Sequence, residues 1–363
     1  MAALAPLVLV TAGGTGGHVY PALAVALELL ARGYRVRWIG TRGGLEHRVV
    51  PAAGIELHYL PVQGVRGKSL WHRLRGVFLL GLACAGALWL VLRLSPRCVV
   101  GMGGYVAGPA GMAAWLLRRP LLIHEQNAVA GTTNRMLAPF AKKIVAGFPD
   151  AFVPKRQVEI LGNPLRRELV EAGAATDYDY DGERPLRLLV LGGSLGAQPI
   201  NEVMPGMVRR LGADARLEVL HQTGEAHVES ARARYGSLLR DNIRIEPFIE
   251  DMVSAYRWAD LVLCRAGALT VSELAVMGRP SILVPLPQAI DDHQTANARS
   301  LASRGAAVLL MQAQMDAYKL GALLREYMAR PAQLAEMAAA AKVAGTPGAT
   351  TAVADRCEAL ING

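Results

Sequence analysis

The 363-residue sequence has few of the features that mark several common classes of protein. Its four cysteines lie far apart and form no CxxC pair, so neither a disulfide framework nor a zinc site is predicted. Aromatic residues make up only 6% of the chain, and no segment matches a zinc-finger, RRM or helix-turn-helix pattern. Nucleic acid is therefore not expected as a partner.

The chain also has no long apolar run. Residues 7–11 lead directly into glycines and no basic segment precedes them, which predicts a first strand instead of a signal peptide. The most apolar run, residues 77–92, is shorter than the ~20 residues of a membrane-spanning helix. We expect it to form a helix that is partly buried and partly seated in a membrane interface. The side chains expected at that interface are Leu70, Trp71, Phe78 and Trp89, beside Arg66, Lys68, Arg73 and Arg75.

Acidic residues are scarce in the first half. Residues 1–166 contain 19 Lys and Arg against 6 Asp and Glu, a net charge of +13, whereas residues 167–363 contain 20 against 24, a net charge of −4. A basic field of this kind attracts an anionic membrane surface or a phosphorylated substrate. The length and the 52% apolar content suit two domains, each with its own core.

The first domain opens with a strand, a glycine loop and a helix. The apolar residues 7–11 form the strand, residues 13–17 a phosphate-type loop and residues 21–32 the helix, with Gly33 past its end. The loop does not match GxGxxG, and the next strand, 35–39, is followed by no acid that could hold a ribose. NAD is therefore not expected, although Arg42 leaves NADP open.

Three strand ends carry polar or glycine-rich segments in this half. His18 follows the first glycine loop, where it could act as a general base or be an ordinary structural histidine. The strand near residues 98–100 leads to Gly103 and Gly104, which serve either a ligand or only a tight turn. The strand 121–123 leads to residues 124–127, where Glu125 is either functional or a local hydrogen-bonding partner.

The second half repeats this opening about 180 residues later, which predicts two Rossmann-like α/β domains with parallel sheets facing each other across a cleft. An apolar strand at 186–191 is followed by a glycine turn at 192–197. Further strands are expected near residues 218–221, 243–246, 260–264, 281–284 and 307–310. The predicted domains are residues 1–165 and 166–345, with a final helix at 346–363 that packs back on the first domain. The acidic segment 177–181 is predicted to be a solvated loop and not a metal site.

Two segments of the second half are candidates for ligand contact. After the strand at 260–264, the small residues 266–268 precede a helix predicted to begin near Thr270, whose hydroxyl would form a capping box with Glu273. Glu273 would then either cap this helix or contact a ligand, and the helix N-terminus would suit a phosphate. The polar segment 291–297 offers donors and acceptors for a sugar, and Asp291 or Asp292 could also cap a helix.

Seven segments of the chain, in this order, resemble the MurG family of bacterial glycosyltransferases. They are GGTGGHVYPALA (13–24), GMGGYVAGPAG (101–111), HEQNAVAGTTN (124–134), GNPLR (162–166), LGGSLGA (191–197), CRAGALTVSE (264–273) and DDHQTANA (291–298). The resemblance covers nearly the whole chain. It implies the two-domain GT-B fold, with acceptor and membrane binding in the N-terminal domain and UDP-N-acetylglucosamine binding in the C-terminal domain.

The resemblance also implies roles for individual residues. Glu273 would hold the ribose hydroxyls, Ile249 the uracil through its backbone, Ser194 and Arg166 the phosphates, and Gln294 and Asn297 the sugar hydroxyls. The other substrate-binding positions implied by the same motifs are Ala268, Leu269, Thr270, Val271 and Ser272, and Thr15, Gly16, Gly17 and Asn127 would close the pocket from the first domain. The acceptor side would include Gly103, Gly104, Tyr105 and Glu125, and His18 would be the base, with no metal and no cofactor.

The activity implied is inverting transfer of N-acetylglucosamine from UDP-N-acetylglucosamine to the C4 hydroxyl of undecaprenyl-pyrophosphoryl-muramoyl-pentapeptide, in cell-wall synthesis. The location implied is peripheral, on the cytoplasmic face of the bacterial inner membrane, an anionic surface where other wall-synthesis proteins are possible partners. Leu195, Ala266 and His293 depart from the family pattern at positions near phosphate and sugar. Two alternatives remain: a UDP-N-acetylglucosamine epimerase, which needs no acceptor, and a non-catalytic membrane adaptor that senses UDP-sugars.

Overall fold

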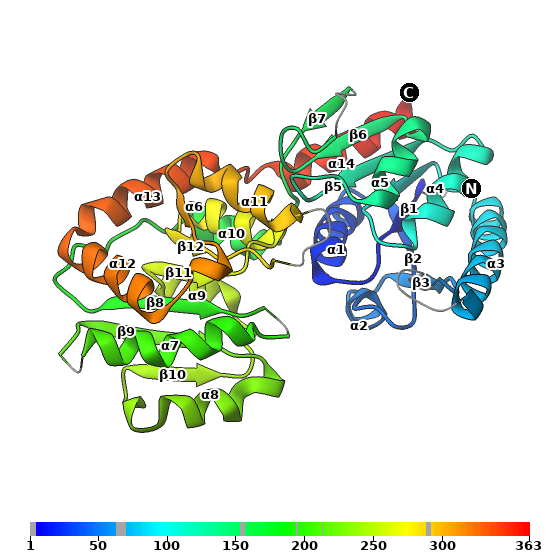
Figure 1. Ribbon diagram of the computed structural model, residues 1–363. Coiled ribbons are helices and arrows are strands. Elements are labelled where there is room, and N and C mark those ends of the chain that lie inside the picture. The colour runs from blue at the N-terminus through cyan, green and yellow to red at the C-terminus, as the bar shows by residue number, and fades with distance from the viewer. Residues whose placement is uncertain (1–4, 63–69, 153–156, 194, 213, 288–291) are drawn as a thin grey trace. The chain divides into compact units, whose positions relative to one another are not determined.

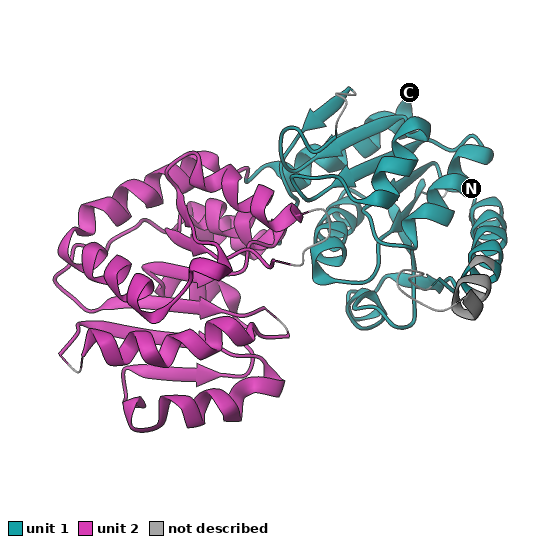
Figure 2. Cartoon of the chain, in the orientation of Figure 1, with its two compact units in different colours: residues 1–166, 347–363 teal, residues 167–346 magenta. Residues whose placement is uncertain are grey.

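A computed structural model describes residues 5–62, 70–152, 157–193, 195–212, 214–287 and 292–363. The chain divides into two compact units (Figure 2). Unit 1 comprises residues 1–166 and 347–363, and unit 2 comprises residues 167–346. Both units are built on parallel sheets with helices on their faces (Figure 1), so the predicted fold class of two parallel α/β domains is confirmed.

Unit 1 contains a seven-stranded parallel sheet in the order β3-β2-β1-β4-β5-β6-β7. Its central strand β1 (Leu7–Thr11) is fully buried and pairs with β2 on one side and β4 on the other. The other strands are β2 (Arg35–Gly40), β3 (Glu56–Tyr59), β4 (Cys98–Gly101), β5 (Leu121–Glu125), β6 (Lys143–Ala146) and β7 (Val158–Ile160). The helices are α1 (Gly16–Ala31), α2 (Glu46–Ala52), α3 (Leu70–Leu94), α4 (Ala107–Leu116), α5 (Thr132–Leu137) and α14 (Ala349–Asn362).

Successive residues of β1 serve two different cores, because side chains alternate between the faces of a strand. Val8 and Val10 pack with residues of α1 and α14, whereas Leu9 packs with residues of α3 and α4 on the other face. The C-terminal helix α14 is also held to α1 by ion pairs from Arg32, whose Nη1 lies 2.7 Å from Asp355 and 2.9 Å from Glu358. The chain therefore ends in unit 1.

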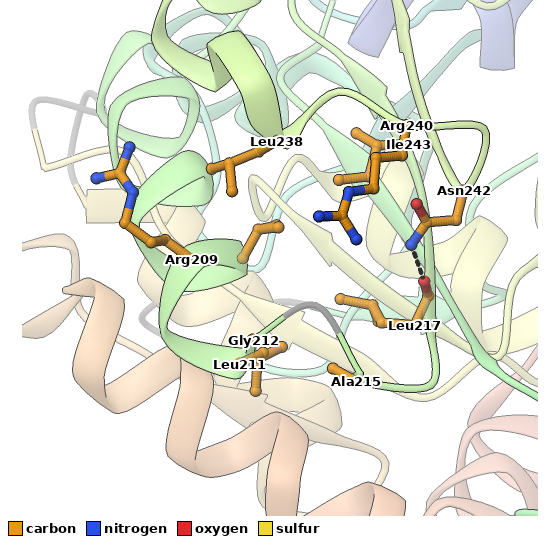
Figure 3. A pocket seen from close by; sticks show the side chains of 10 residues that line it. Arg209, Leu211, Gly212, Ala215, Leu217, Leu238, Arg240, Asn242 and Ile243 are labelled. Carbon is orange, nitrogen blue, oxygen red and sulfur yellow. Dashed lines mark hydrogen bonds between the residues drawn. The ribbon is translucent and has the colours of Figure 1, made fainter.

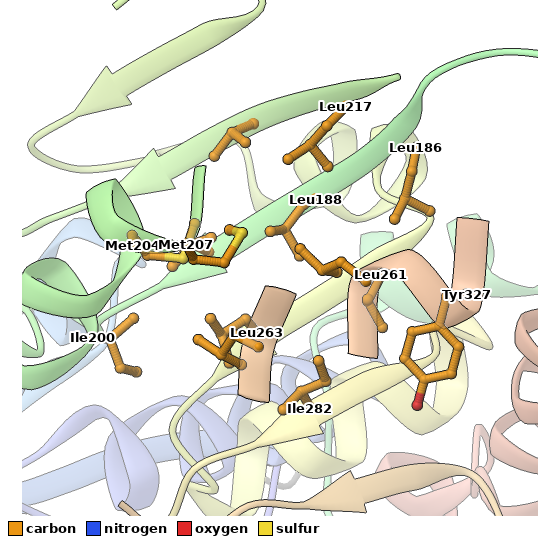
Figure 4. Close-up of a cluster of buried hydrophobic side chains, with 14 of the residues drawn as sticks. Leu186, Leu188, Ile200, Met204, Met207, Leu217, Leu261, Leu263, Ile282 and Tyr327 are labelled. Carbon is orange, nitrogen blue, oxygen red and sulfur yellow. The ribbon is translucent and has the colours of Figure 1, made fainter. Parts of the chain in front are cut away.

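Unit 2 contains a six-stranded parallel sheet in the order β10-β9-β8-β11-β12-β13. Its strands are β8 (Leu186–Leu191), β9 (Leu217–Gln222), β10 (Ile243–Glu246), β11 (Leu261–Cys264), β12 (Ser281–Leu283) and β13 (Ala307–Leu309). The helices are α6 (Arg167–Ala174), α7 (Gln198–Leu211), α8 (Val228–Tyr235), α9 (Met252–Trp258), α10 (Ala268–Met277), α11 (His293–Ala302), α12 (Ala317–Ala329) and α13 (Pro331–Ala344). One core lies where Leu188 and Leu263 of the sheet meet Met204 of α7 and Tyr327 of α12 (Figure 4).

Two predicted helix starts are wrong. Helix α1 begins at Gly16 and not at Pro21, because the carbonyl oxygen of Thr15 already accepts from His18 N at 3.1 Å and Val19 N at 3.2 Å. Helix α10 begins at Ala268, with Gly267 as its N-cap, so Thr270 lies inside the helix and the predicted capping box is absent. Small residues at both sites allow the first turn to form earlier than the side-chain pattern indicates. The strands β3, β6 and β7 were not predicted.

The helix predicted at residues 77–92 is longer than expected, since α3 spans 25 residues. It is partly buried, as predicted, because Ala83, Ala87 and Val91 face the core while Phe78 and Trp89 are exposed. The side chains of Arg66, Lys68, Leu70, Trp71, Arg73 and Arg75 lie outside the described residues. Among the residues described, none of the helices is long and apolar enough to cross a membrane.

Candidate active site

The predicted site residues of unit 1 gather at the carboxyl ends of β1, β4 and β5, which are neighbours in the sheet. Gly16, Gly17 and His18 form the first turn of α1, and Thr15 precedes it as the N-cap residue. Thr15 is exposed and makes no side-chain capping bond, so its hydroxyl is not used to hold the helix. A helix start of this kind presents backbone N–H groups toward an anion.

His18 is held by a line of hydrogen bonds that begins in the segment after β5. Its Nδ1 lies 2.9 Å from Oε1 of Gln126, and Nε2 of Gln126 lies 3.1 Å from Nδ1 of His124. Nε2 of His124 in turn lies 2.9 Å from the carbonyl oxygen of Gly162. Gln126 and His124 are completely buried, and burial lowers the pKa of His124 to about 4, so its ring is neutral near pH 7. His18 is therefore anchored from one side of its ring.

The glycine turn after β4 packs directly against this histidine and against the first glycine loop. A side chain at Gly103, whose φ is +91°, would place its Cβ 2.8 Å from Nδ1 of His18. A side chain at Gly104, whose φ is +80°, would collide with the backbone of Gly13. Both glycines are therefore required for close packing. Tyr105, the next residue, is 58% exposed and accessible to a ligand.

Glu125 is buried and holds the segment that follows β5. Its Oε1 accepts from the backbone N of Asn127 at 3.0 Å and from the Asn127 side chain at 3.2 Å. Its Oε2 accepts from Gly131 N at 3.0 Å and from Nδ2 of Asn134 at 2.8 Å. These contacts match the structural alternative considered for Glu125, in which it orders the segment that carries Gln126 and Asn127.

Glu46, which the sequence did not single out, fixes the glycine loop from the other side. It is fully buried at the start of α2. Its Oε2 accepts from Gly14 N at 3.0 Å, and its Oε1 accepts from Thr41 N at 2.8 Å and from Thr41 Oγ1 at 2.7 Å. One carboxylate thus joins the loop after β1 to the loop after β2.

Replacing Glu46 by glutamine is expected to lower the free energy of unfolding by about 1–3 kcal/mol, because the amide NH2 would face a backbone donor. Urea unfolding measures this loss, and hydrogen exchange at Gly14 reports whether the glycine loop loosens. Glu56→Gln is the control, since Glu56 is half exposed and pairs with Arg37 at the surface, and it should change stability by no more than about 0.5 kcal/mol. Equal effects of the two variants would contradict a special role for Glu46.

Arg166, predicted to contact phosphate, lies at the end of the main segment of unit 1. Its Cζ is 5.9 Å from the centre of the Tyr20 ring on α1, a cation–π distance that directs the guanidinium toward the glycine-loop helix. Ser194, the other predicted phosphate contact, lies outside the described residues.

In unit 2, the predicted donor residues likewise follow the carboxyl ends of neighbouring strands. Glu273 on α10 accepts a hydrogen bond at its Oε2 from the hydroxyl of Tyr256 on α9, at 3.0 Å. Tyr256 is only 1% exposed, so its ring and hydroxyl are fixed by packing. The first turn of α10, from Ala268 through Leu269 and Thr270, follows the N-cap Gly267, which provides no side chain for capping. Its N–H groups resemble an anion site of the kind found at helix N-termini.

Within α10, the side chains of two further predicted residues face protein. Ser272 donates from Oγ to the carbonyl oxygen of Ala268 at 2.9 Å, and Val271 is buried. Val271 therefore supports the helix start, whereas the Ser272 hydroxyl, whose hydrogen is used within the helix, can still accept from a ligand.

The remaining predicted donor residues occupy two other loops. Gln294 accepts at Oε1 from Leu286 N at 3.0 Å, which ties the start of α11 to the backbone just after β12. Asn297 is fully buried and donates from Nδ2 to the carbonyl oxygen of Ala266 at 3.1 Å, so it supports the turn before α10. Ile249 lies in the loop after β10, partly exposed. Asp292 is the N-cap of α11 but accepts from the hydroxyl of Thr295 and not from a backbone N–H, and Asp291 lies outside the described residues.

Two residues that support these loops were missed in the sequence. Arg265, directly after β11, donates from Nη1 to the carbonyl oxygens of Val284 and Pro285, both at 3.2 Å, and from Nη2 to Gln312 at 2.7 Å. Asn201 on α7 donates to the carbonyl oxygen of Thr223 at 3.0 Å. Arg265 could have been identified from the sequence, because it directly follows an apolar strand and lies within the segment 264–273.

The three departures from the family pattern differ in exposure. Leu195 is 85% exposed on the turn after β8 and Ala266 is completely buried. His293 is half-buried at the start of α11. The neighbouring Gly196, with a φ of +77°, lies against the carbonyl of Thr223 so closely that a side chain would not fit there.

Two other polar features of unit 2 lie near the amino ends of its strands, opposite the carboxyl ends that carry the predicted donor residues. In the acidic segment 177–181, Asp179 is exposed and pairs with Arg184 at 3.0 Å, while the tyrosines on either side of it turn inward. A small pocket lies between the end of α7 and the starts of β9 and β10, and Arg209 and Arg240 border it (Figure 3). Neither feature touches the loops that carry the predicted donor residues.

Comparison with known proteins gives full-length matches. The models of the glycosyltransferase family 28 N-terminal and C-terminal domains match residues 8–146 and 187–353. A protein of Stutzerimonas stutzeri (strain A1501), named UDP-N-acetylglucosamine–N-acetylmuramyl-(pentapeptide) pyrophosphoryl-undecaprenol N-acetylglucosamine transferase, is 50% identical over 360 residues, which cover 99% of this chain and 100% of that protein.

Solved structures agree with this similarity. The crystal structure of Acinetobacter baumannii MurG is 40% identical, with a TM-score of 0.82, and the match covers 98% of this chain and 99% of that one. A UDP-GlcNAc 2-epimerase from Neisseria meningitidis, bound to UDP-GlcNAc, has a TM-score of 0.68 at 13% identity, covering 96% of this chain and 98% of that one. The epimerase match shows a shared fold alone.

Proposed function

The chain belongs to glycosyltransferase family 28, and from this membership we infer that it is the N-acetylglucosaminyltransferase that converts lipid I to lipid II in peptidoglycan synthesis. Its substrates are UDP-N-acetylglucosamine and undecaprenyl-pyrophosphoryl-N-acetylmuramoyl-pentapeptide. The observation that carries this conclusion is the 50% identity over 99% of the chain to a transferase named for this reaction. The epimerase alternative rests on a likeness of fold at 13% identity.

The two units are proposed to divide the substrates. Unit 2 would bind the nucleotide sugar, with Glu273 on the ribose, Ile249 at the uracil and Gln294 at the sugar. Unit 1 would bind the acceptor through the loops that hold His18, Gly103 and Tyr105. In support, both sets of residues lie at the carboxyl ends of parallel strands, where α/β sheets bind ligands.

The chemistry proposed is a single displacement that inverts the anomeric carbon. Nε2 of His18 accepts the proton of the muramoyl C4 hydroxyl as the oxygen attacks, and UDP leaves. The negative charge that develops on the diphosphate is stabilised by Arg166 and by the backbone N–H groups at the start of α10. This scheme assigns the charge stabilisation to groups of the protein and includes no metal step.

Transfer of labelled N-acetylglucosamine from UDP to lipid I, with a chelator present, tests the function. Acceptor-dependent formation of lipid II that survives chelation is the expected result. Formation of an epimerised nucleotide sugar without any acceptor would favour the epimerase, and tight UDP binding without turnover would favour the adaptor.

We further propose that unit 1 associates peripherally with the anionic cytoplasmic face of the inner membrane. In support, α3 packs on α4, and α4 on α5, and these helices carry exposed apolar side chains. Phe78, Trp89 and Leu92 of α3 are 67%, 54% and 62% exposed. The guanidinium of Arg93 lies 5.0 Å from the centre of the Trp89 ring, which places a positive charge beside this apolar surface. The exposed apolar side chains of the other two helices are Trp115 and Leu116 of α4 and Met136 of α5.

Replacing Trp89 and Leu92 together by alanine is expected to weaken binding to anionic vesicles by roughly tenfold or more, because each large side chain contributes about 1 kcal/mol or more on leaving water. Sedimentation with vesicles measures the loss. Tyr318→Ala is the control, since Tyr318 is a similarly exposed aromatic residue on unit 2. Release of the native protein from membranes by high salt alone would support peripheral association, whereas a requirement for detergent would contradict it.

A further inference from the structure

Each hydrogen bond in the series from Gly162 to His18 has only one possible donor. The donors can be assigned in turn, starting from the carbonyl oxygen of Gly162. The carbonyl oxygen of Gly162 can only accept, so Nε2 of His124, 2.9 Å away, carries a hydrogen. Because burial keeps the His124 ring neutral, its Nδ1 holds a lone pair and requires a donor. That donor is the amide NH2 of Gln126, 3.1 Å away.

A second contact fixes the orientation of the Gln126 amide independently. The same end of the amide lies 3.4 Å from the carbonyl oxygen of His124, which also can only accept. Both neighbours therefore require the NH2 group at this end, and the opposite end, which faces His18, must be the oxygen. An amide oxygen accepts, so Nδ1 of His18 donates across the 2.9 Å contact.

We propose that Gln126 and His124 are positioning residues that hold neutral His18 in its Nδ1–H tautomer and so leave the lone pair on Nε2. This inference rests on the proposed role of His18 as the base, because it states which nitrogen receives the proton. The other tautomer would carry a hydrogen on Nε2 and could not accept the proton of the acceptor hydroxyl. The buried part of the network therefore specifies which nitrogen is basic before any substrate arrives.

The tautomer can be measured directly by nitrogen NMR on full-length protein labelled with ¹⁵N-histidine. In the wild type, His18 is expected to show a protonated Nδ1 and an unprotonated Nε2, and His124 the reverse. His18→Gln and His124→Gln remove one set of signals each and so assign them. A wild-type His18 with its hydrogen on Nε2 would overturn the proposal.

Gln126→Met removes all three hydrogen bonds of the amide while keeping its size, and His18 is expected to shift toward the Nε2–H form. In Gln126→Glu, one oxygen faces His18 and the other faces two acceptors of His124, so the side chain fits only as the protonated acid, and in that form it is expected to restore the Nδ1–H form. An unchanged tautomer in Gln126→Met would also overturn the proposal. Tyr235→Phe is the matched control, since Tyr235 bonds a different buried histidine, His221, at 3.0 Å in unit 2. It should leave the His18 signals unchanged.

Kinetics separate this inference from the proposed function. Gln126→Met is expected to lower kcat by about tenfold to a hundredfold, a fraction of the contribution of a general base, with the KM for UDP-N-acetylglucosamine unchanged. Partial recovery of kcat is expected in Gln126→Glu. If the tautomer shifts in Gln126→Met but kcat does not fall, the positioning stands and His18 is not the base. If kcat falls without a change of tautomer, the positioning proposal is wrong.

Discussion

Replacing His18 by alanine is expected to lower kcat for lipid II formation by about 10²–10⁴, which is the usual contribution of a general base. The KM for UDP-N-acetylglucosamine should change little, because the lost interaction is with the acceptor hydroxyl and forms only as the proton moves. Steady-state transfer of labelled sugar to lipid I, at varied donor and acceptor concentrations, measures both constants.

His47→Ala provides the control for this experiment. His47 is an exposed histidine of the same unit, and its Nδ1 lies 2.8 Å from the hydroxyl of Tyr59, away from the line of bonds that holds His18. Its replacement should leave kcat within a factor of about two, because surface contacts of this kind contribute little. Full turnover of the His18 variant with lipid I would show that another group accepts the proton.

Much of the fold follows from local patterns in the sequence. Apolar runs of five or six residues, such as β1 and β8, predict buried parallel strands because both faces of such a strand must avoid water. The glycine-rich turns after these strands predict a close approach of backbone, which the packing of Gly104 against Gly13 confirms. The strands β3, β6 and β7 were missed because they are short and lie beside prolines and charged residues, so neighbouring strands determine them more than their own composition does.

The side-chain network of the site is less accessible to sequence reasoning, because it depends on which strand ends become neighbours. The sequence HEQN (124–127) was recognised as part of a motif, but no role was predicted for Gln126. Only the strand order β1-β4-β5 brings Gln126 beside His18. Glu46 has no motif and acts through the packing of α2 against two loops. The capping box predicted for Glu273 is absent because α10 begins at Ala268, and the carboxylate instead accepts from Tyr256, 17 residues earlier in the chain.

The second large effect is expected on UDP binding, when Glu273 is replaced. Replacing it by alanine is expected to weaken the affinity for UDP by about 10²-fold or more, because a hydrogen bond to a charged group contributes about 1.5–3 kcal/mol and a carboxylate can accept from both ribose hydroxyls. Calorimetric titration of UDP into the full-length protein measures the change. Since this binding is proposed to be the same in the ground state and the transition state, KM for the donor should rise more than kcat falls.

Tyr256→Phe distinguishes a direct contact between Glu273 and the ribose from an indirect effect of the Tyr256–Glu273 hydrogen bond. It removes the 3.0 Å bond that orients Glu273 but leaves the carboxylate, so a loss of no more than about tenfold is expected. Titration with 2′-deoxy-UDP completes a double-mutant cycle between protein and ligand. The wild type should prefer UDP strongly over the deoxynucleotide, and Glu273→Ala should lose most of that preference, because the acceptor for the missing hydroxyl is gone. An equal preference in both proteins would mean that the ribose is held elsewhere and that Glu273 serves only the packing of α9 on α10.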